Sequence, residues 1–513
     1  MHYSIPYPNL KYSCKLPREG ITMNADELYA ICKRRGFLWQ SAEIYGNVAG
    51  FYDYGHLGAM LKRNWENSWL HYFLSLNDNY HLIDTTNIMP ESALKASGHV
   101  DLFTDFLVTC KKCSQPYRAD ALIEEVSGIS AESLSAEELD KKIRELNIRC
   151  PRCGAAEFSE ARPFNMMFPV AIGAEGKDRG YLRPETAQGA YLNFSREFET
   201  CRRKLPLGLA IIGRAFRNEI SPRQGLYRLR ELIQAELQIF FDPEKFNEQC
   251  SIPDNAGKLR VVLVDKRPEI QELSAGDLLS RGYPVFYVYH MLKIQEFYTT
   301  VLGVPVEKFR FFEKSEKERA FYNRIHFDVE LNLETLGGFK EVAGLHYRGD
   351  YDLTRHQQMS KVSQEVNIDG RKFVPHVLEL SFGVDRNVWA LLDIFMTKDK
   401  ERNILKIKPY IAPYHCGIFP LFKKDGLDAV ALQVHERLRK KLRTFYDDSG
   451  SIGRRYARMD EIGTPFCITV DYDTIQEGAL KDTVTLRFRD TAEQKRIRIA
   501  DIEREIQEHI LPP

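Results

Sequence analysis

IGRAFRNEISPRQGLYRLRELIQAELQIFF, residues 212–241, joins two strand-like runs through a polar loop. Five charged side chains lie on that loop: Arg217, Glu219, Arg223, Arg228 and Arg230. In the second run, alternating side chains point to opposite faces of a strand, which leaves an apolar core face and a surface bearing Gln234, Glu236 and Gln238. Such a hairpin can hold a polyanion and a small polar molecule side by side. The alternative is a solvated hairpin with surface charges.

A second charged segment, HVLELSFGVDRNVWALLDIF, covers residues 376–395. Its first half alternates like a strand, with Glu379 and Ser381 on the polar face, and Gly383 precedes a run with helical spacing. This pattern predicts that Arg386 lies in the first turn of a helix, where the helix dipole opposes a cation. The arginine is favourable there if it binds an anion such as phosphate. An arginine that bends outward to solvent is the alternative.

Two further polar segments carry less information by themselves. They are YLRPETAQGAYLNF, residues 181–194, and GGFKEVAGLHYRGDYDLTRH, residues 337–356. Each concentrates charged or amide side chains between apolar flanks, and each alone is typical of a solvated loop. The chain has no GxxxxGK[ST] loop and no GxGxxG motif after a strand, so a bound nucleotide would depend on the arginines rather than on a glycine-rich loop.

The composition indicates a folded protein of about two to four domains. The chain has 513 residues, 43% of them hydrophobic, and its 72 Lys and Arg balance its 72 Asp and Glu. A nucleic-acid surface would therefore be a local basic patch. The N-terminal segment has no signal-peptide pattern, and no apolar run approaches the roughly 18–20 residues that span a bilayer. We expect a soluble, cytoplasmic protein that does not enter a membrane.

Four of the ten cysteines form two CxxC pairs, Cys110 with Cys113 and Cys150 with Cys153. Two such turns supply the four thiolates of a tetrahedral zinc site, in which no ligand position is left open for catalysis. A capping box at residues 135–138, followed by helical spacing of apolar residues, predicts a short helix that returns the second pair to the first. We expect structural zinc, and a metal-free vestige of such a site is the alternative.

The segment 396–405 is charged and poor in large apolar residues, and we expect a linker there. The residues beyond it alternate strand-like and helical patterns, which is typical of a compact α/β unit. Arg454, Arg455 and Arg458 within this unit are candidate phosphate contacts, since clustered arginines favour polyanions. An exposed charged loop is the alternative.

Taken together and in order, these segments resemble the class II aminoacyl-tRNA synthetases, and in particular the homodimeric glycyl-tRNA synthetases. Residues 216–231 resemble motif 2 of the class, and residues 379–386 resemble motif 3. DTTNIMP at 84–90 is similar to motif 1, whose proline lies at the dimer interface in the family. RPETAQG at 183–189 resembles the amino-acid-binding loop, and residues 452–474 resemble the signature of the anticodon-binding domain.

The resemblance implies an α+β fold in two parts. Residues 1–400 would form a class II catalytic domain built on an antiparallel sheet flanked by helices, with the four-cysteine module inserted at 105–160. A second insertion, at about 244–310, carries no clear motif and has no assigned role. Residues 405–513 would form a C-terminal α/β anticodon-binding domain. The family further implies a homodimer whose partners are ATP, glycine and glycine tRNA.

By the same resemblance, the enzyme would activate glycine with ATP and transfer it to the 3′ end of glycine tRNA. The amino-acid carboxylate is already ionised, so the reaction needs positioning and charge neutralisation at the α-phosphate rather than a general base. The family pattern implies catalytic roles for Arg217 at the α-phosphate and Arg386 at the γ-phosphate end. The positions that match the family's ATP contacts are Arg217, Asn218, Glu219, Tyr227, Arg228, Leu229, Arg230, Glu231, Leu232, Glu341, Val342, Gly383, Val384, Asp385 and Arg386. Magnesium normally bridges the phosphates in this class, and Glu341 and Glu379 are the candidate ligands.

The resemblance also implies a set of residues for the amino acid. The positions that match the family's glycine contacts are Arg118, Glu185, Leu232, Ile233, Gln234, Ala235, Glu236, Glu379, Leu380, Ser381, Phe382 and Gly383. Glu185, Glu236 and Ser381 would surround the ammonium group. Two carboxylates in one pocket repel each other, and a bound ammonium relieves that repulsion. A filled pocket excludes amino acids larger than glycine by steric clash.

One departure from the family pattern is Leu380, which stands where the family usually has proline. The alternation points it away from the polar face, so we expect altered local stiffness rather than altered specificity. Two other hypotheses are a catalytically inactive synthetase-like protein that binds nucleic acid, and a synthetase for another small amino acid. Arg217 and Arg386 argue against the first, and Glu185 with Glu236 argues against the second. A transcription or RNA-processing factor would account for the four-cysteine module only.

Overall fold

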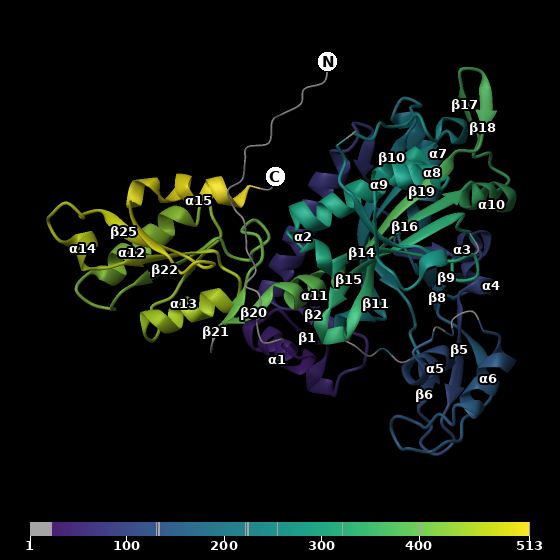
Figure 1. Ribbon diagram of the computed structural model, residues 1–513, viewed down its shortest axis with the longest axis horizontal. Coiled ribbons are helices and arrows are strands. Elements are labelled where there is room, and N and C mark those ends of the chain that lie inside the picture. The colour runs from purple at the N-terminus through teal and green to yellow at the C-terminus, as the bar shows by residue number, and fades with distance from the viewer. Residues whose placement is uncertain are drawn as a thin grey trace.

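The computed structural model describes residues 23–129, 131, 134–220, 222, 225–253, 255–320, 322–399 and 402–511. Arg223 of the polar loop and the first 22 residues lie outside these ranges. A nine-stranded sheet forms the centre, in the order β13-β12-β14-β15-β16-β19-β11-β10-β3 (Figure 1). Its strands are β3 (Tyr80–Leu82), β10 (Leu207–Phe216), β11 (Glu231–Phe241), β12 (Leu259–Val262), β13 (Gln271–Leu273), β14 (Phe309–Glu313), β15 (Ile325–Leu333), β16 (Gly338–Gly349) and β19 (His376–Gly383).

The central strands of this sheet, from β14 to β10, pair antiparallel. β3 pairs parallel with β10, and β12 pairs parallel with β14. Strands β10 and β11 are the two runs of the quoted hairpin, and they pair along their whole length from Leu207–Phe240 to Phe216–Glu231. The expected fold class, α+β with an antiparallel sheet flanked by helices, is confirmed.

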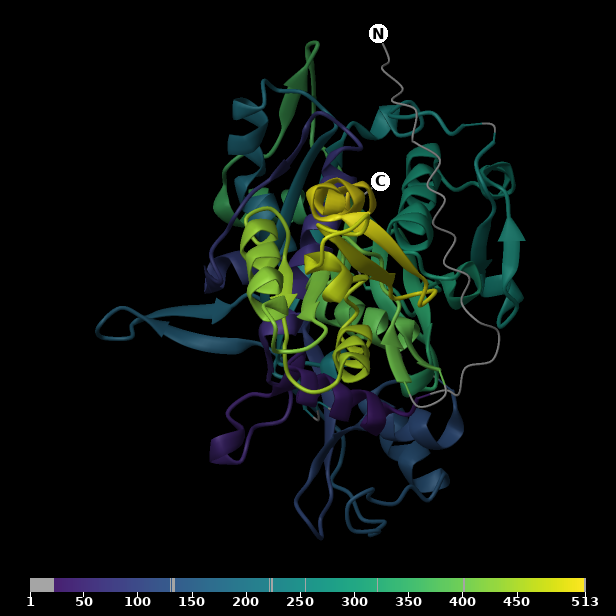
Figure 2. The same cartoon turned by 90° about the vertical axis from the view of Figure 1, so that its left-hand side faces the viewer.

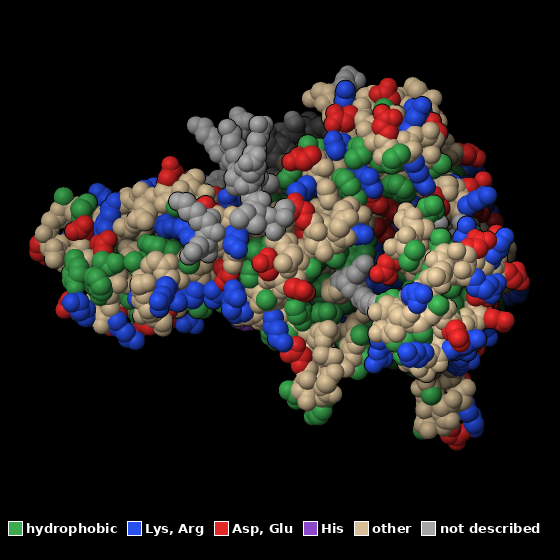
Figure 3. Space-filling view, turned by 60° about the horizontal axis from the view of Figure 1, so that its bottom comes forward, with side chains coloured by type: hydrophobic (Ala, Val, Ile, Leu, Met, Phe, Trp, Pro, Cys, Tyr) green, Lys and Arg blue, Asp and Glu red, His purple; other side chains and the backbone are tan. Residues whose placement is uncertain are grey.

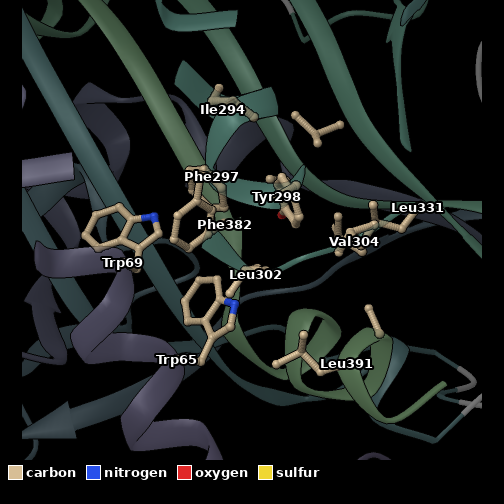
Figure 4. Packing of buried hydrophobic residues seen from close by; sticks show 14 of the residues in the cluster. Trp65, Trp69, Ile294, Phe297, Tyr298, Leu302, Val304, Leu331, Phe382 and Leu391 are labelled. Atoms are coloured by element: carbon tan, nitrogen blue, oxygen red, sulfur yellow. The ribbon is translucent and has the colours of Figure 1, made fainter. Parts of the chain in front are cut away.

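One face of the sheet carries the main hydrophobic core. The helices that contribute to it include α2 (His56–Leu74), α9 (Val285–Glu296) and α11 (Val384–Phe395). Trp65 and Trp69 of α2 lie against Phe297 and Phe382, as Figure 4 shows. Burial of this many large aromatic side chains is the main source of stability for the sheet, because removing one such ring from a core costs about 3–5 kcal/mol.

The opposite face of the sheet is covered by α7 (Ala187–Thr200), which forms a second core. Phe194 of α7 stacks on Phe240 of β11, with the ring centroids 4.4 Å apart. Both faces of β11 are therefore buried, including Gln234, Glu236 and Gln238. The interpretation of this polar face as a strand surface is wrong, and its carboxylate and amides form a buried polar layer instead.

The region 244–310 continues the central sheet rather than forming a separate body. β12 pairs with β13 and with β14, which in turn pairs with β15. Val261 of β12 and Phe311 of β14 are fully buried in the main core. The region also contains α8 (Ala275–Ser280) and α9. Its structural role is therefore to extend the sheet and supply part of its core.

Residues 396–405, expected to be a linker, contain a hairpin of β20 (Met396–Asp399) and β21 (Arg402–Leu405). The expectation is wrong because Met396, Ile404 and Leu405 are buried, whereas Lys398 and Asp399 are exposed. The hairpin leads into a unit with its own core and a five-stranded sheet. The sheet consists of β23 (Thr444–Tyr446), β22 (Cys416–Pro420), β24 (Phe466–Val470), β25 (Thr483–Phe488) and β26 (Gln494–Arg498), in spatial order. Its helices are α12 (Leu427–Leu438), α13 (Ile452–Glu461), α14 (Tyr472–Ile475) and α15 (Ile502–Ile510).

The C-terminal unit lies on one side of the sheet domain (Figures 1 and 2). The four-cysteine module projects from the sheet domain at a separate place, at the lower right in Figure 1. Glu461 of α13 fixes the unit to the N-terminal helix α1 (Ala25–Arg35). Its Oε1 accepts hydrogen bonds from Nη2 of Arg34 at 2.7 Å and from Nδ2 of Asn403 at 2.9 Å. The carboxylate is largely buried, so these charge-assisted contacts hold the two units in a defined relation.

The four-cysteine module is a small α+β unit of its own. It contains β5 (Thr104–Thr109), β6 (Pro116–Arg118), β7 (Arg162–Asn165), α5 (Ala119–Ser127) and α6 (Ala136–Glu145). Ser135 caps α6 through a capping box with Glu138, as the sequence predicts. Leu139 and Ile143 of α6 are buried in the core of the module. This helix brings the second cysteine pair back to the first.

The remaining elements lie around these units. They are β1 (Leu38–Gln40), β2 (Tyr52–Tyr54), β4 (Ile88–Pro90), α3 (Glu91–Ala96), α4 (His99–Leu102), β8 (Phe168–Ile172), β9 (Asp178–Leu182), α10 (Tyr351–Ser360), β17 (Val366–Ile368) and β18 (Arg371–Phe373). β4, β9 and β8 form a small sheet whose outer hairpin projects from the body in Figure 2. Among the described helices, none is both long and apolar enough to cross a membrane.

Candidate active site

The register of the central sheet gathers polar side chains from distant parts of the sequence. Glu236 of β11 is paired with Ser381 of β19. Two residues along, Gln238 is paired with Glu379. Residues two apart on a strand point to the same face, so these four side chains share one side of the sheet. They lie beneath α7 and form a buried polar pocket.

Glu236 is held by two hydroxyl groups. Oγ of Ser381 donates to Oε1 at 2.7 Å, and Oγ1 of Thr186 donates to Oε2 at 2.6 Å. Burial, together with the charges of Glu379 and Glu185, raises the pKa of Glu236 to about 7. Near pH 7 the carboxyl group is therefore only partly ionised, and a cation beside it would favour its charged form.

Glu185 reaches the pocket from the loop before α7. Its Oε1 accepts a hydrogen bond from Nε2 of Gln188 at 3.0 Å, and its Oε2 lies 3.5 Å from Nε2 of His99. Nη2 of Arg348 lies 3.7 Å from Oε1. Burial opposes ionisation, yet the charges of His99 and Arg348 hold the pKa of Glu185 well below its ordinary value. Glu185 is therefore a carboxylate at neutral pH.

The guanidinium of Arg348 binds two of the acidic groups below the pocket. Arg348 is 1% exposed and donates to Oε2 of Glu379 at 2.7 Å. It donates twice more to Asp352, at 2.8 and 2.9 Å. Glu185 lies near the same arginine, whereas Glu236 lies near a second buried guanidinium, that of Arg183. The pocket therefore has an excess of negative charge, and a small cation of about the size of an ammonium group would be stabilised there.

A cleft opens beside the pocket, between the polar loop and the start of α11. Its lining includes Arg217, Glu219, Tyr227, Asp385 and Arg386. The guanidinium of Arg386 lies 4.6 Å from the ring centre of Tyr227, and its Nη1 lies 2.9 Å from Oε1 of Glu341. Arg386 is in the first turn of α11, as the sequence predicts. Its guanidinium faces the cleft, and the side chain does not bend outward to solvent.

Arg217 lies at the junction between the cleft and the pocket. Its Nε donates to the carbonyl oxygen of Pro184 at 3.0 Å. Pro184 directly precedes Glu185, so the guanidinium lies close to the backbone that carries Glu185. On the other side of the cleft, Asp385 supports the start of α11. It accepts hydrogen bonds from the hydroxyl of Tyr54 and from the amide of Ile233, both at 2.6 Å.

Two other arginines of the loop, Arg228 and Arg230, are engaged with protein groups. Arg230 donates to the carbonyl oxygen of Glu219 at 2.9 and 3.1 Å and to that of Ala49 at 3.0 Å. Arg228 lies 3.8 Å from a carboxylate oxygen of Glu219. Arg230 thus fixes the loop backbone, whereas Arg228 remains at the lining of the cleft. The backbone amide of Asn218 donates to the carbonyl oxygen of Met166.

Several expected contact residues point away from the pocket and the cleft. Leu229 and Ile233 belong to the main core and also line the cleft. The apolar side chains that lie in the main core without lining the cleft are Ala235, Val342, Leu380, Phe382 and Val384. Only their backbones can face a ligand. For Leu380 this confirms the expected direction. Glu231 binds Arg214 at the strand entrance, Leu232 lines the cleft, and Gly383 ends β19 beside Arg386.

Two expected ligand contacts are engaged with protein groups. Arg118 lies 3.2 Å from Asp105 and also binds Asp120, and the charge of Glu219 in the cleft acts on it as well. Glu379 is paired with His346, five residues along β16 from Glu341, with a bulge between Glu341 and Ala343. Glu379 is already engaged by Arg348, His346 and Tyr191. Only Glu341, half-exposed at the cleft, fits the expected ligand role.

Some residues of the pocket were not identified from the sequence. Three of them lie in sequence segments that alone are typical of solvated loops: Thr186, Arg348 and Asp352. No sequence pattern marked His99 or Tyr54 as a functional residue. The available clue was the strand period of residues 338–349, since Gly344, His346 and Arg348 alternate with apolar residues. A charged side chain on a strand that is buried on both sides requires a partner of opposite charge.

The four cysteines of the two CxxC pairs converge at the end of the module. Their Sγ atoms all lie within 4.8 Å of one another. Cys110 and Cys153 are 3.6 Å apart, as are Cys113 and Cys150. Four thiolates at this spacing can surround one zinc ion at about 2.3 Å each.

The C-terminal arginines differ in what they can bind. Arg455 is 3% exposed and donates to the carbonyl oxygens of Pro420 and Gly450, so it is a structural residue. The expectation that it contacts phosphate does not fit its burial beneath the surface of the unit. Arg458 binds Asp447, and Arg454 is exposed. Lys and Arg side chains gather along one edge of this unit in Figure 3.

Comparison with known proteins gives consistent results along the chain. A family model described as tRNA synthetase class II core domain (G, H, P, S and T) matches residues 168–253, and one described as anticodon binding domain matches residues 415–509. The glycine--tRNA ligase of Pyrococcus furiosus is 39% identical, with 94% of this chain and 98% of the relative covered. Those of Methanothermobacter thermautotrophicus and Methanococcus maripaludis are 36% and 34% identical, with 94% and 93% of this chain and 98% of each relative covered. A solved structure of prolyl-tRNA synthetase from Cryptosporidium parvum, complexed with L-proline and AMP, has a TM-score of 0.57 at 14% identity and covers 96% of this chain and 78% of that one. This last likeness shows the fold alone.

Proposed function

The chain belongs to the glycine--tRNA ligases, and from this premise we propose that it activates glycine with ATP and transfers it to glycine tRNA. The observation that carries the proposal is the 39% identity over almost the full length of both chains. The buried pocket with its excess of carboxylates supports it, because glycine offers an ammonium group and no side chain. We assign residues 1–400 to catalysis and residues 405–513 to recognition of the anticodon.

In the proposed reaction, the carboxylate of glycine attacks the α-phosphorus of ATP and pyrophosphate leaves. Arg217, between the cleft and the pocket, would contact both reacting groups. Arg386 would hold the γ-phosphate end, and Glu219 would bind the adenine amino group. No general base is required, so the contribution of the protein is alignment and charge neutralisation. Magnesium bound at Glu341 would neutralise further charge on the phosphates.

The ammonium group of glycine would lie between Glu185, Glu236 and Ser381. Thr186 and Ser381 orient Glu236, whereas Gln188 and His99 orient Glu185. The ammonium group compensates the repulsion between the two carboxylates. α7 and the filled polar layer leave little space for a side chain on the amino acid, so larger substrates would be rejected by clash.

The function is tested by charging. Purified protein with ATP, magnesium and glycine tRNA should attach glycine to the tRNA, as measured by acid-precipitable labelled glycine. A catalytically inactive relative that only binds nucleic acid would charge none, and this result would contradict the proposal.

The binding of glycine should depend on pH through Glu236. Since its pKa is raised to about 7, the carboxyl group loses its charge in the empty pocket as the pH falls below that value. We expect the KM for glycine to rise by up to about ten-fold for each pH unit below 7 and to level off above it. Exchange assays across this range measure the effect. In Glu236→Gln the KM should be high and this pH dependence lost, and an unchanged profile would contradict the assignment.

We propose that the four cysteines bind one structural zinc ion. The convergence of their Sγ atoms supports this, and the ion would close the end of the module. Cys150→Ser should lower the zinc content from about one ion per chain to nearly none and make residues 105–160 sensitive to protease. Metal analysis and limited proteolysis measure both effects, with Cys201→Ser as the control outside the module. Zinc-free wild-type protein with a protease-resistant module would contradict the proposal.

We propose further that the protein acts in the cytoplasm as a homodimer through the face around β4. Leu192 of α7 and Pro90 of β4 line one surface hollow, and Leu192, Leu82 of β3 and Ile88 of β4 expose apolar side chains. Exposed apolar side chains that gather on one face are typical of an interface. Ile88→Asp should shift the protein toward the monomer in sedimentation-velocity experiments. Val126→Asp, an equally exposed position on the four-cysteine module, should not. A wild-type monomer, or equal effects of the two variants, would contradict the proposed interface.

A further inference from the structure

A pair of largely buried histidines lies beside the pocket and has no part in the chemistry proposed above. His326 and His346 face each other across β15 and β16, with their Nε2 atoms 3.0 Å apart. Nδ1 of His346 lies 2.7 Å from Oε1 of Glu379. Nε2 of His326 lies 2.9 Å from Oδ1 of Asp328. The four side chains form a line that ends at the polar layer of the pocket.

The sheet is shaped to accommodate the ring of His346. A Cβ atom at Gly344 would lie 2.5 Å from Nε2 of His346, so only glycine leaves room for the ring at this position. Gly344 is also the register partner of Ser381, one of the groups that hold Glu236. The imidazole therefore occupies the space between the pocket and Asp328.

The hydrogen bonds define which nitrogen atoms carry protons. His346 must donate from Nδ1, because the carboxylate of Glu379 can only accept. Nδ1 of His326 is buried without a hydrogen-bond partner among the described residues, and a buried unpaired N–H is rarer than an unpaired acceptor. His326 therefore carries its proton on Nε2, directed toward Asp328 and His346. In this way Asp328 sets the tautomer of His326, and His326 favours the tautomer of His346 that donates to Glu379.

Glu379 in turn restrains Arg348. This arginine uses one N–H on Glu379 and two on Asp352, while its Nη2 remains 3.7 Å from Glu185, beyond hydrogen-bond distance. The guanidinium is a rigid fork of donors. Nη1 is the group that binds Glu379, whereas Nε and Nη2 bind Asp352. If Glu379 moved away, Nη1 would lose its partner, and the guanidinium, held by Asp352 alone, could tilt its Nη2 toward Glu185. That contact would neutralise the carboxylate that receives the ammonium group of glycine.

We propose that His346 is a positioning residue for glycine binding: by holding Glu379 on Arg348, it keeps Glu185 free for the ammonium group of the substrate. This inference rests on the proposed function and adds a residue that does not touch the substrate. The electrostatics agree with it. Burial opposes the charge of Glu379, yet Arg348 and His346 together hold its pKa at about 2.

Two substitutions at one position test the role. His346→Leu removes the donor at nearly constant volume, whereas His346→Asn places an amide N–H close to the position of Nδ1. We expect the leucine variant to raise the KM for glycine about ten-fold or more, because a hydrogen bond to a buried charge is lost. The kcat and the KM for ATP should change little, and the asparagine variant should recover most of the loss. His326→Leu, which is remote from Glu379, should raise the same KM by a smaller factor.

The proposal is overturned if the KM for glycine keeps its wild-type value in both leucine variants. It is also overturned if kcat and both KM values worsen together, or if His346→Asn is as impaired as His346→Leu. Should His346→Leu fail to fold, the KM of His326→Leu for glycine is compared with that of the wild type, and an unchanged value overturns the proposal. A wild-type protein without glycine-dependent activity contradicts the proposed function, whereas an active wild type with unaffected variants contradicts only the role of His346.

Discussion

Replacing Arg386 with alanine is expected to lower the rate of glycine-dependent ATP–pyrophosphate exchange by about a hundred-fold or more. The reason is the position of the side chain. Arg386 stacks on Tyr227, binds Glu341 and lies in the first turn of α11, at the edge of the cleft. Binding of ATP would place phosphate charge beside this guanidinium, and the variant leaves that charge without its counterion.

Two controls separate this effect from general damage. Arg386→Lys retains the charge but loses the planar fork and the stacking, so it should have intermediate activity. Arg504→Ala, at an exposed arginine of the distant helix α15, should be fully active. Thermal unfolding and sedimentation show whether each variant keeps its fold and assembly. Full exchange activity in a folded Arg386→Ala protein would show that the cleft is not the nucleotide site.

The second large effect is expected at Glu185. Glu185→Gln keeps the size of the side chain and its acceptor for Gln188 but removes the charge. Loss of one partner from a buried charge pair costs about 2–5 kcal/mol, so the KM for glycine should rise by roughly 30-fold to 4,000-fold. The KM for ATP should remain near the wild-type value, because the nucleotide cleft does not contain Glu185.

A matched control lies on the helix that follows. Glu199→Gln removes an exposed carboxylate at the end of α7, where it binds Arg203, and should leave both KM values unchanged. Measurement of initial rates over a range of glycine and ATP concentrations distinguishes the two substrates. A Glu185→Gln protein with wild-type affinity for glycine would remove this carboxylate from the proposed pocket.

The fold class was predictable because its signals are local. The strand period of residues 232–240 and the strand-to-helix change at Gly383 correspond to β11, β19 and α11. The capping box at Ser135 correctly marks the start of α6. Charged composition was misleading at residues 396–405, where a few buried apolar side chains are enough to dock a hairpin.

The charge balance of the pocket was harder to predict. Glu185 and Glu236 could be proposed from the family pattern, but their environment depends on Arg348, Asp352 and His99, which come from other segments. The register of β11, β19 and β16 brings these groups together, and register is a property of the sheet rather than of any one segment. Likewise, Glu341 lies five residues along β16 from His346, the residue paired with Glu379. This separation can be known only once the pairing of β16 with β19 is known.

The most direct test of the central claim is ATP–pyrophosphate exchange with glycine, alanine, serine and proline, each as the sole amino acid. The account predicts exchange with glycine and none above background with the other three, because the pocket accepts an ammonium group and excludes a side chain. Exchange with another amino acid would retain the adenylation chemistry but contradict the proposed pocket. No exchange with any of the four, from folded protein with magnesium present, would contradict the account of this chain as an active glycine--tRNA ligase.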